Sequence, residues 1–117
     1  METFSHSICA RLRDIAMALP ETSEGASCVN RAFKVRKKNF LFVGEQGDQI
    51  RVMVRLSASL PAAEEMADPR VDVGKFGWVT LRFAVDDALD SELLEAWALE
   101  SFRAMAPKTV LAQIASA

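Results

Sequence analysis

Three short apolar segments separated by two polar turns, all within residues 32–56, constrain the fold of this chain more than any other feature. Residues 32–36 and 49–56 alternate between apolar and polar side chains, which is the pattern of a strand with one buried face. Residues 40–43 are apolar throughout, which indicates a strand in the middle of a sheet. Because the intervening turns are too short for a crossover, the three strands are expected to form an antiparallel meander, with Asn39 and Gly47 at turn positions.

A fourth strand is predicted for residues 78–83, where every second side chain from Val79 to Phe83 is apolar and is expected to be buried. The alternate positions carry Trp78 and Arg82. An aromatic side chain and a cation therefore share the face that is expected to meet solvent.

Helical periodicity is found in residues 7–19 and again in residues 91–105, which follow an acidic segment suited to a helix N-terminus. A short helix is expected at residues 60–67, and residues 21–31 are expected to form a loop. This order predicts one α+β domain over residues 1–117, with an antiparallel sheet of about four to five strands packed on the N- and C-terminal helices.

Composition narrows the class of protein. The start of the chain lacks the features of a signal peptide, and no apolar segment approaches the roughly 18 residues of a membrane span, so we expect a cytoplasmic protein without a membrane partner. Cys9 and Cys28 lack the spacing of a metal site or a disulfide framework, which favours two reduced thiols. The net charge is −2, yet residues 31–55 carry seven Lys and Arg side chains against Glu45 and Asp48. The middle of the chain is therefore cationic, and the C-terminal half is acidic.

These cations and Trp78 define a candidate binding face, provided that the strands share one sheet. Cations on such a face can neutralise phosphates, and an exposed Trp can stack on a base. The candidate nucleic-acid-binding residues are Lys34, Arg36, Lys37, Lys38, Arg51, Arg55, Lys75, Trp78 and Arg82. The alternatives are a solvated face whose Arg stems cover the sheet, lysines that protect the hairpin edge, and a Trp78 that packs beneath the C-terminal helix.

Other chemistry is weakly indicated. Glu24 and Arg31, in the expected loop, are a weak candidate for holding a small ligand, and a carboxylate that anchors the loop is the preferred interpretation. His6 is the only histidine and is expected at a frayed start, so no metal site and no catalytic base are predicted. The motifs of phosphate-binding loops and of serine nucleophiles are absent. We therefore expect no enzyme activity, no cofactor and no metal.

Two groups of residues carry a resemblance. The first is Leu19-Pro20, Glu24-Gly25 and Ala32-Phe33-Lys34-Val35-Arg36, followed by Lys38 and Phe40; the second is Gly74-Lys75-Phe76-Gly77-Trp78-Val79 with a closing Ala106-Pro107-Lys108. In order and spacing they resemble the MmcQ/YjbR family over nearly the whole chain. The resemblance implies a frataxin-like (CyaY-like) two-layer α+β sandwich, a fold also compared with the double-wing C-terminal domain of the phage transcription factor MotA. Members of the family are commonly labelled DNA-binding on the basis of that structural comparison, so the resemblance also implies DNA binding. It supplies no catalytic residue.

Two positions depart from the family pattern. Lys37 stands where a Gly is expected in the first hairpin, and Asp72 stands near the position where a Tyr or His is frequent. An iron-binding role like that of frataxins is not expected, because the first helix offers Arg11, Arg13 and Asp14 in place of an acidic face.

The favoured hypothesis is a DNA-binding protein that holds DNA, or another polyanion, on a basic sheet face and its hairpin. The alternative is a non-enzymatic protein-interaction or small-ligand adaptor, in which the cationic middle of the chain meets an acidic partner. Self-association is one form of this alternative, since the cationic sheet of one copy can face the acidic C-terminal helix of another. The chain is accordingly expected to be a monomer or a weak homodimer.

Overall fold

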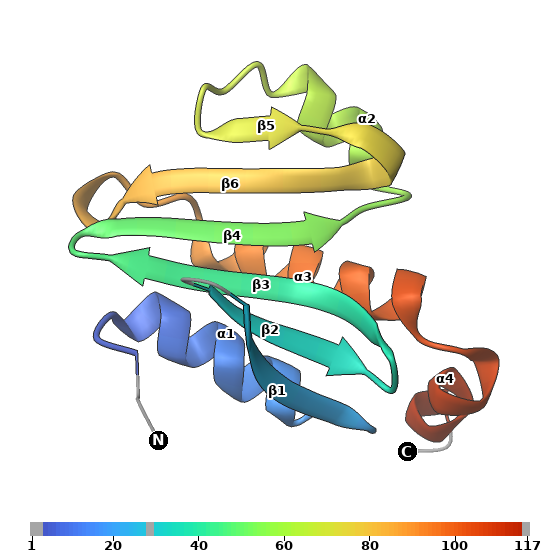
Figure 1. Ribbon diagram of the computed structural model, residues 1–117. Coiled ribbons are helices and arrows are strands. Elements are labelled where there is room, and N and C mark those ends of the chain that lie inside the picture. The colour runs from blue at the N-terminus through green and yellow to red at the C-terminus, as the bar shows by residue number, and fades with distance from the viewer. Residues whose placement is uncertain (1–3, 28–29, 116–117) are drawn as a thin grey trace.

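Figure 1 shows the computed structural model, which describes residues 4–27 and 30–115. The helices are α1 (Ser7–Met17), α2 (Leu60–Glu65), α3 (Ser91–Met105) and α4 (Lys108–Ala115), with the short 3-10 helices η1 (Lys75–Gly77) and η2 (Val85–Asp87). The strands are β1 (Thr22–Ser27), β2 (Asn30–Val35), β3 (Lys38–Gln46), β4 (Gln49–Arg55), β5 (Val71–Val73) and β6 (Trp78–Ala84). Among these residues, none of the helices has the length and the apolar character needed to cross a membrane.

The six strands form one antiparallel sheet in the order β1-β2-β3-β4-β6-β5. The predicted α+β class and the β2-β3-β4 meander are confirmed. The loop predicted for residues 21–31 is wrong, because β1 lies there and pairs with β2 along its whole length. β1 is an edge strand held by backbone hydrogen bonds, so its sequence lacks the apolar alternation by which a strand is recognised.

The core lies between one face of the sheet and the helices α1 and α3, which pack on that face and on each other (Figure 1). Side chains at alternate positions of β4 and β6 point into it and are fully buried or nearly so, as predicted. A bulge beside Phe33 lets Phe40 and Leu41, which are consecutive in β3, both face the helices. Phe40 meets Phe102 of α3 edge to face, with ring centroids 5.3 Å apart. The core therefore fixes which face of the sheet is left for solvent.

The β2–β3 turn lies at Arg36 and Lys37, and Asn39 belongs to β3, so the turn predicted for residues 37–39 is displaced by one residue. Arg36 has a φ of 55°, a hairpin-turn conformation that usually requires Gly. Glu21 holds it there: the Arg36 N–H donates to the Glu21 carbonyl at 3.0 Å, and the guanidinium donates to the Glu21 carboxylate at 2.8 and 3.1 Å. Arg36, one of the candidate binding cations, is therefore already paired within the chain and is less available to an external anion.

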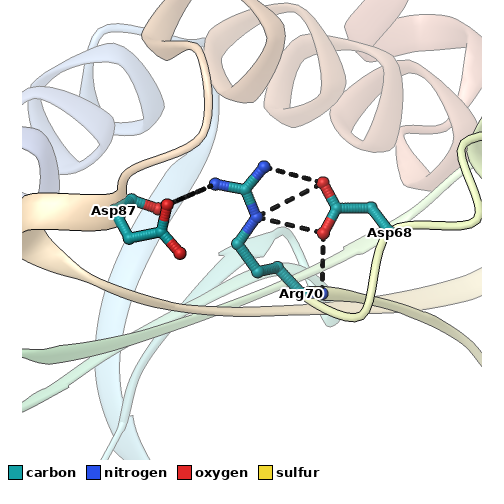
Figure 2. A network of polar contacts seen from close by, with 3 residues as sticks. All are labelled: Asp68, Arg70 and Asp87. Atoms are coloured by element: carbon teal, nitrogen blue, oxygen red, sulfur yellow. Dashed lines mark hydrogen bonds and ion pairs between the residues drawn. The ribbon is translucent and has the colours of Figure 1, made fainter.

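The short edge strand β5 is secured by a polar clasp, which Figure 2 shows. Arg70 donates to the Asp68 carboxylate at 2.7 Å through Nη2, and to the Asp87 carbonyl at 2.8 Å through Nη1. The side-chain and backbone hydrogen bonds from Arg70 lower the pKa of Asp68 from its ordinary 3.8 to about 2. The clasp joins the segment before β5 to the turn that follows β6, and so holds the edge of the sheet in place.

Candidate binding site on the open sheet face

One face of the sheet is left open. α1 and α3 pack on the other face, and in the described part of the chain no helix lies across this one (Figure 1). Strand register sets the neighbours on the open face. One row across the strands is Asn30, Gly44, Arg51 and Arg82, and the next is Ala32, Phe42, Met53, Thr80 and Asp72. The open face is thus a mixture of cations, apolar side chains and small residues.

An aromatic pair lies on the open face. The rings of Phe42 on β3 and Trp78 on β6 lie 6.0 Å apart at 58°, reaching across β4. Both side chains are half-buried, and the neighbouring Val79 is fully buried on the helix side. Trp78 therefore does not pack beneath α3. The tryptophan that lies in the core is Trp97, which belongs to α3 itself. A tilted, accessible pair of rings can accept a third ring by stacking.

Beside the aromatic pair is a hollow of about 270 Å³, lined in part by Asn30, Gly44, Arg51 and Arg82. Among the described residues, Oδ1 of Asn30 and Nε of Arg51 are buried and have no hydrogen-bond partner. An unsatisfied buried polar group costs about 1–3 kcal/mol, so each such group calls for a physical reason. Arg82 has a distant partner, with Nη1 3.8 Å from Oδ2 of Asp72.

Arg55, which was predicted to lie with these cations on the open face, is engaged at the end of the sheet. Its Nε donates to the carbonyl of Phe76 at 3.0 Å, and its Nη1 lies 3.4 Å from Sδ of Met105 on α3. Its backbone N–H donates to Oγ of Ser101 at 2.8 Å. Arg55 therefore connects the end of β4 to η1 and to α3.

The hairpin cations form a second group, separate from the open face. Arg36, Lys37 and Lys38 line a cleft of about 430 Å³, whose opposite wall comes from Met105 and its neighbours at the end of α3. Lys75 is exposed in η1, and Lys34 is exposed on the open face. The structure therefore brings Lys34, Arg51, Trp78 and Arg82 to one face and leaves the other candidates around its margin.

Glu24 and Arg31 lie on the helix-covered side of the sheet, in β1 and β2. Glu24 is only 9% exposed and accepts a hydrogen bond from Nε of Arg13 on α1 at 2.8 Å. Nε of Arg31 is 3.8 Å from the same carboxylate. The carboxylate ties the edge of the sheet to α1, which is the anchoring role preferred from the sequence, although it anchors a strand and not a loop.

The start of α1 is anchored from the sheet. The Glu45 carboxylate accepts the backbone N–H of His6 at 3.1 Å, and the His6 ring lies 2.7 Å from the Gly47 carbonyl, so the frayed start predicted for His6 is wrong. Burial, together with the charge of Glu45 and a hydrogen bond to it, raises the pKa of the Cys9 thiol to about 12. Among residues 4–27 and 30–115, no three His, Cys, Asp or Glu side chains gather where they could hold a metal ion.

Four residues of this region were not identified from the sequence. Phe42 was expected only as part of a central strand that is apolar on both faces, and Asn30 and Gly44 join the row of Arg51 only through strand register. Phe76 is 82% exposed and has a φ of 60°, which is rare for a bulky side chain. Phe76 could have been noticed as an aromatic residue within a Gly-Lys-Phe-Gly segment. Asn30 and Gly44 could not, because the identity of a single residue does not show which residue of the next strand lies opposite it.

Comparison with known proteins places the chain in a family. The family model described as YjbR matches residues 17–104, which include all six strands and most of α3. No curated protein matches the chain.

Proposed function

The chain belongs to the YjbR family, and from that premise we propose that it binds DNA as a single strand on the open sheet face, without catalysing a reaction. The aromatic pair of Phe42 and Trp78 carries this proposal. Bases within a duplex are already stacked on each other, so an aromatic pair on an open sheet suits unpaired bases.

The surrounding charges suit a phosphate backbone. Lys34 is exposed on the same face, and neither it nor Arg51 forms an ion pair within the described chain. Cations that have no internal partner can take up phosphates without first breaking an ion pair. The net charge of −2 limits such binding to a local patch, since the rest of the surface repels a polyanion.

The side chains of the open face are of kinds that hold a ligand. Arg and Lys contact phosphates, Phe and Trp stack on bases, and Asn and Thr form hydrogen bonds with base edges or sugars. The exposed carboxylate on this face, Asp72, lies near Arg82. We therefore propose a binding module in which the face positions a strand and does not act on it.

Fluorescence anisotropy with a labelled oligothymidylate tests the proposal. We expect saturable binding at about 50 mM salt that weakens strongly at about 200 mM, and weaker binding to a duplex of the same length. Phe42→Ala or Trp78→Ala should each reduce affinity roughly five- to a hundredfold, which is the stacking contribution of one base. The absence of binding to either form of DNA at low salt would overturn the proposal.

A charge-reversal pair controls for general electrostatics. Lys34→Glu removes a cation from the open face, whereas Arg103→Glu makes the same change on an exposed position of α3, on the other side of the sheet. We expect Lys34→Glu to weaken binding and to lower the salt dependence by about 0.7 per lost phosphate contact. Equal losses in the two variants would show that net charge, and not the open face, governs association.

A further inference from the structure

We infer that the hollow between Asn30, Gly44, Arg51 and Arg82 is a binding site for a phosphate group. This inference goes beyond the proposed function, because a phosphorylated small molecule can occupy the hollow whether or not a strand lies on the sheet. The inference rests on the arrangement of the four residues and on the unmet hydrogen-bonding capacity of two of them.

Strand register builds the hollow. Asn30 lies opposite Gly44, Gly44 opposite Arg51, and Arg51 opposite Arg82, so the four residues form one row across β2, β3, β4 and β6. Gly44 has no side chain, and the gap that it leaves in the row separates Asn30 from the two arginines. Glu45, Gln46, Gln49 and Ile50, at the β3–β4 hairpin end, complete the lining of the hollow. The Glu45 carboxylate is already engaged by the backbone N–H of His6.

Two positive charges are neighbours within this row. Arg51 and Arg82 are directly opposite on neighbouring antiparallel strands, an arrangement that destabilises a sheet unless an anion neutralises it. The carboxylate near Arg82 is a weak neutraliser, because the Arg82 and Asp72 side chains are 56% and 69% exposed and their charged atoms are 3.8 Å apart. Arg51 forms no ion pair in the described chain.

The unsatisfied atoms indicate what kind of ligand fits. Within residues 4–27 and 30–115, Nε of Arg51 is a buried donor without an acceptor, and the Asn30 side-chain amide has a buried oxygen without a donor. A phosphate monoester can accept from both guanidiniums through separate oxygens, and its protonated form can donate to the Asn30 oxygen. A carboxylate has only two oxygens and offers no donor when ionised. The phosphate group therefore matches the hollow better than a carboxylate does.

Size and surroundings are consistent with a small phosphorylated molecule. The hollow, at about 270 Å³, lies just below the roughly 300–1,000 Å³ of pockets for drug-sized ligands. Phe42 is two residues from Gly44 along β3, on the same face and about 6.5–7 Å away. A nucleoside monophosphate can therefore place its phosphate in the hollow and its base against Phe42.

Nuclear magnetic resonance of the arginine side chains tests the inference. The Nε–Hε signals of the full chain are followed during titration with inorganic phosphate, thymidine monophosphate, thymidine, and sodium chloride at matched ionic strength. We expect saturable shifts of the Arg51 and Arg82 signals with both phosphates, tighter saturation with the monophosphate, and no saturable shift with chloride. The same experiment without any saturable shift from either phosphate would overturn the inference.

Two variants and one control make the result specific. Arg51→Gln and Arg82→Gln should each weaken phosphate binding at least tenfold, whereas Arg103→Gln, which removes a charge from an exposed position of α3 on the other side of the sheet, should leave it within about twofold. Arg82 is mostly exposed, so its variant serves if Arg51→Gln fails to fold. Phosphate binding without oligonucleotide binding would retain the inference and reject the proposed function. If no phosphate binds, and the chain binds the oligonucleotide equally well with Arg51→Gln, the inference is rejected and the proposed function is retained.

Discussion

At the scale of single residues, Ser101 shows how a buried polar group positions the sheet. Its hydroxyl accepts the backbone N–H of Arg55 at 2.8 Å and donates to the backbone carbonyl of Phe40, and the side chain is fully buried. The bulge in β3 and the end of β4 would otherwise leave these two backbone groups unsatisfied inside the core. One hydroxyl on α3 therefore replaces the ladder hydrogen bonds that the bulge removes.

Replacing Ser101 by Ala should lower the free energy of unfolding by about 1–3 kcal/mol, because the Arg55 N–H and the Phe40 carbonyl lose their partner in a buried place. Urea unfolding followed by circular dichroism measures this change. Ser91→Ala, at the exposed first residue of α3, is the matched control and should change stability by less than about 0.5 kcal/mol. Similar losses in both variants would contradict the bridging role of Ser101.

Cys9 should be chemically inert in the folded protein. The thiolate is the reactive form, and burial with the nearby Glu45 carboxylate raises the pKa of this fully buried thiol to about 12. We expect iodoacetamide at pH near 8 to leave Cys9 unmodified in native protein and to alkylate it quickly in urea, as measured by peptide mass spectrometry. Equal alkylation rates in the two conditions would show that Cys9 is accessible.

At the scale of elements, the sequence predicts strands well where one face is buried and poorly where backbone bonding alone holds them. Alternation in β4 and β6 identified the buried side chains correctly, because burial selects apolar residues at every second position. β1 was missed, and the β2–β3 turn was displaced onto Arg36, whose φ depends on a tertiary contact with Glu21. The hollow could not be predicted, because it depends on which residues of different strands lie opposite each other.

The clasp of edge strand β5 should be sensitive to acid. Arg70 lowers the pKa of Asp68 to about 2, so the stabilising contribution of the pair is complete above the ordinary Asp68 value of 3.8 and is lost as pH falls toward 2. Thermal unfolding of wild-type protein and Asp68→Asn should therefore differ most near neutral pH and converge between about pH 4 and pH 2.

The control for this comparison is Asp86→Asn, a change in the exposed turn η2 at a residue that has no ion pair within the described chain. Its unfolding temperature should stay within about 1–2 °C of wild type at neutral pH. A pH-independent difference between wild-type protein and Asp68→Asn would contradict the role assigned to the ionised pair.

At the scale of the whole molecule, carboxylates of helix α3 contact earlier parts of the chain. Arg11 of α1 lies 2.8 Å from the Glu95 carboxylate of α3, and Glu100 of α3 accepts the Ser57 and Ser59 backbone N–H groups at 2.9 and 3.0 Å. Although partial burial opposes it, hydrogen bonds from Ser59 and Ser57 lower the pKa of Glu100. Two carboxylates of α3 are thereby engaged within the molecule and are less able to attract a second copy.

This internal pairing bears on oligomeric state. Because Glu95 and Glu100 of α3 already have partners in the same chain, we expect a monomer in sedimentation velocity at both about 50 mM and about 300 mM salt. A dimer that dissociates as salt is raised would instead support self-association of the cationic sheet with the acidic helix. Lys34→Glu would then be expected to abolish that dimer, which the same measurement can show.

The most direct test of the central claim, that the open sheet face is the binding surface, is a map of amide and indole chemical-shift changes on addition of oligothymidylate. We expect the largest changes at Lys34, Phe42, Met53, Thr80 and the Trp78 indole, with small changes along α1 and α3. Changes confined to the cleft between the β2–β3 hairpin and the end of α3, or spread evenly over the surface, would contradict it.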